Sequence, residues 1–180
     1  YMGLGLGTKG AIIAALFQIV AHSLTKPMLF LSASGLSDTI DRRQDFASLR
    51  SSAHNNKIAA ISYSAGALSM VGIPIFSGFA SKLLFAEAAV VDPSWRMFPT
   101  LIVLAISTIL NAIYFLKTVL RIYTPEAASV IEEKGFTNRT WKQQRWYTLA
   151  IILFIILNLV LGMNSQPILA LIKNGLHNFA

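Results

Sequence analysis

The chain of 180 residues is 54% hydrophobic and 13% charged, whereas soluble domains carry about 25% charged residues. Its charged residues cluster between long apolar runs, which predicts a protein that crosses a membrane several times rather than a soluble enzyme. The absence of cysteine excludes disulfides and cysteine-ligated metal or iron–sulfur centres. We attribute the net charge of +7 to the membrane interface and not to nucleic acid binding, because the basic residues lie mostly in loops.

The first predicted span covers residues 10–33. It contains Gln18, His22 and Lys26, spaced four residues apart, so the three side chains stack on one face of an otherwise apolar helix. Pro27 is expected to kink the helix beside Lys26. We interpret the stripe as a hydrophilic path. The alternative is that Gln18 and His22 only hydrogen-bond neighbouring helices, which suits Lys26 less well because apolar residues flank it on both sides.

A polar loop over residues 34–57 follows, with charges of both signs. The next predicted span, residues 58–73, is rich in alanine, glycine and serine, which allow helices to approach closely in lipid. A third span is predicted over residues 75–91.

The third span contains the residue that is hardest to explain by packing, which is Lys82. A charged ammonium near the bilayer centre is costly and usually faces protein or water because it has a function. Gly72, Pro74 and Gly78 precede it and predict an interruption of the helix, as at ion sites of transporters. Glu87 is five residues from Lys82, so the two do not share a helix face and make a poor pair.

The fourth predicted span covers residues 98–123 and has Lys117 near its end, where a membrane anchor is favoured over a role in a proton path. The second polar loop, 124–145, leads to a fifth span at 146–163 that is apolar except for Asn158, for which we expect packing and lipid contact. An amphipathic tail occupies 167–180. We treat residues 1–180 as a single membrane domain.

Five spans would place the loops 34–57 and 124–145 on opposite sides of the membrane. Residues 117–145 contain six Lys and Arg and residues 34–57 contain four, a difference that weakly favours the second loop as the cytoplasmic one.

Two motifs resemble a known family. His22-Ser-Leu-Thr-Lys26-Pro-Met-Leu-Phe-Leu is similar to a His-x-x-x-Lys-x-x-Leu-Phe-Leu signature, and Gly72-Ile-Pro-Ile-Phe-Ser-Gly-Phe-Ala-Ser-Lys82 to a Gly-x-Pro-x-x-x-Gly-Phe-x-x-Lys signature. Both belong to the antiporter-like membrane subunits of respiratory complex I, Mrp cation/proton antiporters and membrane-bound hydrogenases. The resemblance covers essentially the whole chain. The residues after Lys82 are more similar to those of Mrp D-type or hydrogenase-type subunits than to those of the largest complex I member.

The resemblance implies an all-α bundle like the second of two inverted five-helix repeats, with a discontinuous helix near Gly72–Gly78. It implies that Lys82 takes part in proton transfer and that His22 and Lys26 lie on the hydrated path leading to it, and we take Lys82 as the main proton-loading site. Three further residues are candidates to support this path: Gln18, Lys117 and Glu87. Because the first repeat would lie upstream of Tyr1, the chain is expected to be a piece of a longer one.

The implied function is proton translocation within a redox-driven pump resembling NADH-quinone oxidoreductase or a hydrogenase, in the cytoplasmic membrane of a bacterium or archaeon. Other membrane subunits and the lipid bilayer are the expected partners, and no cofactor, metal or redox centre is expected in this chain. One alternative is an Mrp-type antiporter subunit that exchanges Na⁺ for protons. The other is a non-pumping structural half-subunit that only scaffolds a membrane complex.

Overall fold

The computed structural model describes residues 1–40, 46–91, 95–125 and 141–179, and every regular element in these ranges is a helix. The prediction of an all-α bundle is thereby confirmed at the level of fold class. In chain order the elements are α1 (Met2–Leu6), α2 (Lys9–Ser37), the 3-10 turn η1 (Asp38–Ile40), α3 (Ser52–Asn55), α4 (Lys57–Val71), α5 (Ser77–Val91), α6 (Met97–Tyr123), α7 (Trp141–Met163) and α8 (Gln166–Phe179).

Three of the described segments are long and apolar enough to cross a membrane: Lys9–Ile40, Met97–Tyr123 and Gln144–Met163. They correspond to α2, α6 and most of α7. The outward faces of α6 and α7 carry large apolar side chains, such as Ile109 and Leu153, that are more than half exposed. Such a surface suits contact with lipid tails or with other membrane helices.

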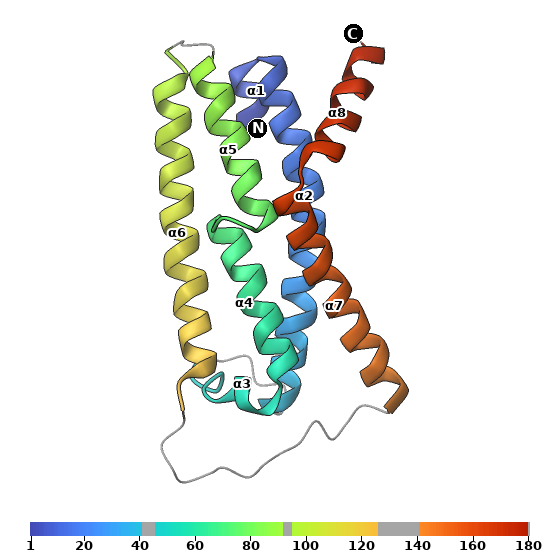
Figure 1. The fold of residues 1–180 in the computed structure, drawn as a ribbon. Helices are drawn as coiled ribbons and strands as arrows, with labels where there is room; N and C mark the ends of the chain where they lie inside the picture. Colours follow the sequence, from blue (N-terminus) through green and yellow to red (C-terminus); the bar gives the residue numbers. More distant parts are fainter. Residues whose placement is uncertain (41–45, 92–94, 126–140, 180) are drawn as a thin grey trace.

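The helices α4 and α5 are each shorter than a membrane span and lie end to end. Each has 15 residues, which is about 22 Å at 1.5 Å per residue and less than the roughly 30 Å of a bilayer core. Figure 1 shows them stacked end to end between α2 and α6, with a short connection in the middle. The sequence predicted two separate spans, over 58–73 and 75–91. The count of five spans is therefore not confirmed.

The predicted placement of the two polar loops on opposite sides is wrong. The amide of Ser51, in the first loop, donates to the carbonyl oxygen of Thr124, where the second loop begins, at 3.0 Å. The guanidinium of Arg121 also donates to the carbonyl oxygen of Phe46 at 3.2 Å. The physical reason is that α4 and α5 together make one crossing and α6 returns (Figure 1). Most of the second loop, residues 126–140, lies outside the described residues.

Small residues bring α2 and α4 close together. The hydroxyls of Ser32 and Ser62 lie 2.7 Å apart across the two helices, and both side chains are fully buried. A Cβ at Gly66 would lie 2.8 Å from the side chain of Leu29. This close packing between α2 and α4 fixes the position of the break relative to the polar stripe on α2.

Candidate functional site

The break between α4 and α5 is formed by local backbone chemistry. Gly72 ends α4 with φ +89°, and its amide donates to the carbonyl oxygens of Leu68 and Ser69. Glycine adopts this left-handed conformation without the steric penalty of a Cβ. Pro74 lacks an N–H and cannot continue the ladder of hydrogen bonds, so a new helix starts only at Ser77.

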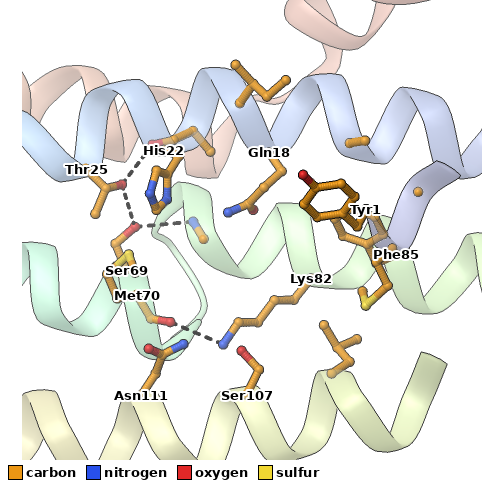
Figure 2. Close-up of a pocket in the computed structure, with 17 residues that line it drawn as sticks. Tyr1, Gln18, His22, Thr25, Ser69, Met70, Lys82, Phe85, Ser107 and Asn111 are labelled. Carbon is orange, nitrogen blue, oxygen red and sulfur yellow. Dashed lines mark hydrogen bonds between the residues drawn. The ribbon is translucent and has the colours of Figure 1, made fainter. Parts of the chain in front are cut away.

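The side chain of Lys82 reaches back from α5 to the end of α4 (Figure 2). Its Nζ lies 2.6 Å from the carbonyl oxygen of Val71 and 3.2 Å from that of Met70. These carbonyls belong to the last turn of α4, where the helix leaves acceptors unpaired and its dipole is negative. The end of a half-helix therefore provides a favourable position for an ammonium group inside the bundle.

The third acceptor comes from α6. The ammonium of Lys82 donates to Oγ1 of Thr108 at 2.9 Å, and the Thr108 hydroxyl itself donates to the carbonyl oxygen of Leu104 at 2.9 Å. Because the hydroxyl proton of Thr108 is used in the bond to Leu104, its oxygen presents a lone pair to Lys82. A protonated lysine has three N–H donors. All three are used.

The amine of Lys82 borders a cavity of about 370 Å³, which is large enough for several water molecules. The cavity lies among α2, α4, α5 and α6, and Tyr1 with the start of α1 borders it as well (Figure 2). Its lining combines an apolar wall with polar side chains from three helices besides α5: Gln18, His22 and Thr25 of α2, Ser69 of α4, and Ser107 and Asn111 of α6.

Comparison with known proteins identifies the family to which this site belongs. Residues 1–111 match the family model described as NADH:quinone oxidoreductase/Mrp antiporter, TM. The chain belongs to this family. The resemblance inferred from the two sequence motifs is thereby confirmed, and the chain is an integral membrane protein.

The curated relatives come from both branches of the family. The chain is 31% identical to NADH-quinone oxidoreductase subunit N of Desulforudis audaxviator over 68% of its own length and 24% of the relative's. It is 26% identical to the D-type subunit of the Na(+)/H(+) antiporter of Alkalihalophilus pseudofirmus over 93% of its own length and 32% of the relative's. NADH-ubiquinone oxidoreductase chain 5 of Pelomedusa subrufa is 31% identical over 61% of this chain and 18% of the relative. The chain thus spans about a third or less of these relatives.

The structure brings together three of the residues that the sequence predicted for the proton path of this family member. Gln18, His22 and Lys82 all line the cavity. The amide oxygen of Gln18 also accepts a hydrogen bond from the hydroxyl of Ser81, which joins α2 to α5. Lys26, one turn beyond His22, is half-buried and is not among the cavity-lining residues.

Two other predicted residues lie elsewhere. Lys117 is exposed at the end of α6, and its ammonium lies 5.6 Å from the ring centre of Phe46. Glu87 borders a second cavity of about 530 Å³ near the other end of the molecule, together with Thr8 and Lys173. The structure therefore does not bring Lys117 or Glu87 to the cavity that contains Lys82.

Sequence reasoning missed Thr108 as a partner of Lys82 and assigned Asn158 only to packing. Asn158 is fully buried and accepts a hydrogen bond from the amide of Ser77, the first residue of α5. The single amide side chain in an otherwise apolar span indicates a hydrogen bond to another helix, because a buried polar group requires a partner. The identity of the partner was not readable from the sequence, since 81 residues separate Asn158 from Ser77. Within the described residues, no group of three or more His, Asp or Glu side chains gathers that could hold a metal ion.

Proposed function

We propose that this chain conducts protons through the cavity beside the helix break, with Lys82 as the group that accepts and releases the proton. The observation that carries the proposal is the position of the Lys82 amine: it is held by the end of α4 and Thr108 and borders a cavity lined by Gln18 and His22. A lysine that served only packing would not need a polar cavity beside it.

The geometry suggests how proton release would proceed. The ammonium has one donor for each of three acceptors, whereas a neutral amine has only two N–H groups and a lone pair. After losing a proton, the amine can no longer satisfy Met70, Val71 and Thr108 together, and its lone pair is repelled by the carbonyl oxygens. The flexible four-carbon side chain then turns toward the cavity, where water supplies a donor. Proton release and movement of the amine are coupled in this way.

His22 is proposed to exchange protons with Lys82 through cavity water, because imidazole accepts and releases protons near neutral pH. Lys26 extends the stripe by one further turn of α2, and Gln18 anchors the stripe to α5 through Ser81. Lys117 and Glu87 act outside this cavity, Lys117 as an anchor at the membrane surface.

The larger assembly is proposed to be a redox-driven proton pump in a bacterial or archaeal cytoplasmic membrane, with electron transfer in other subunits. Several relatives bear the names of NADH-quinone or NADH-ubiquinone oxidoreductase subunits. A cation/proton antiporter is the second candidate, because the relative that is named as part of a Na(+)/H(+) antiporter aligns with 93% of the chain.

The test compares Lys82→Ala with Lys117→Ala, since each change removes one ammonium and only Lys82 borders the cavity. Proton transport is measured in vesicles containing the intact complex, with and without Na⁺. We expect Lys82→Ala to remove most transport and Lys117→Ala to retain it, with both complexes assembled. Full transport by an assembled Lys82→Ala complex would refute the proposal and favour a scaffolding role. A requirement for Na⁺ in the wild type would select the antiporter.

A further inference from the structure

The helix α7 contacts the break at two positions one turn apart, Asn158 and Gly162. A Cβ at Gly162 would lie 2.1 Å from the carbonyl oxygen of Ile75 and 2.5 Å from the carbonyl carbon of Phe76. The backbone of α7 therefore lies directly against the connection between α4 and α5. Ile75, at this contact, has φ +88°, which is unfavourable for a β-branched residue and requires support from its surroundings.

Asn158 supplies a hydrogen bond that α5 lacks at its beginning. The first amides of a helix have no intrahelical acceptor and are normally satisfied by a capping side chain nearby in sequence. Here the Oδ1 of Asn158 accepts the amide of Ser77 at 3.3 Å, and the Oγ of Ser69 accepts the amide of Gly78 at 3.3 Å. The beginning of α5 is thus held by α7 on one side and by α4 on the other.

The same asparagine is tied to the polar side of α2. Its Nδ2 donates to Oγ1 of Thr25 at 2.8 Å, and that oxygen lies 3.3 Å from the Oγ of Ser69. The hydroxyl of Thr25 donates to the carbonyl oxygen of Ala21 at 2.9 Å, so it is oriented to accept from Asn158. Asn158, Thr25 and Ser69 are all buried, and Figure 2 shows the bond between Thr25 and Ser69 beside the cavity.

These contacts determine where Lys82 lies relative to its acceptors. Lys82 belongs to α5, whereas Met70 and Val71 belong to α4, so a shift of the beginning of α5 changes the distances from Nζ to both carbonyl oxygens. A Cβ at Gly78 would lie 1.8 Å from the carbonyl oxygen of Ser69, which shows how closely the two half-helices meet.

We propose that Asn158 is a positioning residue for proton exchange at Lys82. It acts from α7, outside residues 1–111 that match the family model, by holding the amide of Ser77 and the hydroxyl of Thr25. It does not itself line the cavity. This inference rests on the proposed function of Lys82.

The experiment uses the intact complex in vesicles and replaces Asn158 with residues of similar size. Asn158→Leu removes both hydrogen bonds, whereas Asn158→Asp keeps an acceptor for Ser77. Leu153→Ala on the exposed face of α7 is the control. We expect Asn158→Leu to lower proton transport per assembled complex about tenfold or more, since small misplacements at a reacting group have effects of this size. Asn158→Asp should recover only part of the loss, because it keeps the acceptor for Ser77 but loses the donor to Thr25 and buries a carboxylate. Leu153→Ala should equal the wild type.

Two further readouts separate positioning from general loss of structure. Amide hydrogen exchange in the peptide covering residues 72–85 should be faster in Asn158→Leu, with exchange across α6 unchanged. The shape of the pH profile of transport should also change, whereas a smaller amount of intact complex would only scale it. If Asn158→Leu does not assemble, Asn158→Ala takes its place with the same expectations.

Wild-type transport and pH profile in the Asn158 variants would overturn the inference, whether or not hydrogen exchange rises. Lys82→Ala, measured in vesicles of the same composition, separates failure of this inference from failure of the proposed function. If Lys82→Ala abolishes transport while the Asn158 variants behave as wild type, only the inference fails. If Lys82→Ala transports normally, the proposed function fails, and the role of Asn158 in it fails as well.

Discussion

The ammonium of Lys82 lies 2.6 Å from the carbonyl oxygen of Val71, the last residue of α4, although Lys82 itself belongs to α5. A bond across the interruption of a helix is possible because the connection folds the start of α5 onto the end of α4. The Lys82 ammonium thereby donates to the carbonyl oxygens that the interruption leaves without a helical partner. Break and lysine thus form one structural unit.

Gly72→Ala tests whether the break makes room for the lysine. A Cβ at position 72 would lie 2.9 Å from Cδ and 3.2 Å from Nζ of Lys82, at a residue whose φ is +89°. A left-handed conformation costs a residue with a Cβ about 1–2 kcal/mol. We expect a lower melting temperature of the solubilised complex and reduced proton transport, because the amine is displaced from Val71.

Gly175→Ala in α8 is the matched control for Gly72→Ala, since a Cβ there would meet nothing within 4 Å. Equal stability and transport in the Gly72→Ala and Gly175→Ala complexes would show that Gly72 does not shape the lysine site.

Thr108→Val tests the third acceptor of Lys82. Valine has nearly the shape of threonine but cannot accept a hydrogen bond, and hydrogen bonds to charged groups contribute about 1.5–3 kcal/mol. We expect the rate of proton transport to fall about tenfold, with the complex assembled. Thr100→Val, on the same helix and with the same bond to the carbonyl oxygen four residues earlier, should have no effect on transport. Identical rates in the two variants would remove Thr108 from the site.

The part of this site that was predictable from the sequence is the part encoded locally. A glycine and a proline beside a lysine in an apolar run predict an interruption and a buried charge, and a spacing of four residues puts Gln18 and His22 on one face. The partners of Lys82 and Asn158 depend on which helices pack together, which local spacing does not encode. The span count is not confirmed for a related reason: α4 and α5 each have the composition of a span, and their end-to-end stacking, which indicates one shared crossing, could not be predicted from local composition.

The polar stripe on α2 gives a graded prediction. His22 borders the cavity, whereas Lys26 is half-buried one turn away and does not border it. We expect His22→Ala to slow proton transport more than Lys26→Ala does, because a proton in cavity water reaches the imidazole first. Ser23→Ala, at an exposed position on the same helix, is the control and should transport protons at the wild-type rate. Wild-type transport in His22→Ala would exclude the imidazole from the path.

The corrected topology gives a prediction about orientation in the membrane. Among the described residues, six Lys and Arg lie toward the end of the bundle where Ser51 contacts Thr124: Arg50, Lys57, Lys117, Arg121, Lys142 and Arg145. Three lie toward the other end: Lys9 at the start of α2, Arg96 before α6 and Lys173 in α8. An excess of basic residues marks the cytoplasmic side. We therefore expect the end with α3 to face the cytoplasm.

Single cysteines test this orientation with no competing cysteine in this chain, since it has none. Ala47→Cys and Gln144→Cys occupy exposed positions at the α3 end, and Trp95→Cys occupies an exposed position at the other. In intact cells a membrane-impermeant maleimide should label only Trp95→Cys, and in inverted vesicles only Ala47→Cys and Gln144→Cys. Labelling of Ala47→Cys and Gln144→Cys from opposite sides would restore five separate spans. In that case α4 and α5 would each cross the membrane, and the amine of Lys82 could not lie at the end of α4.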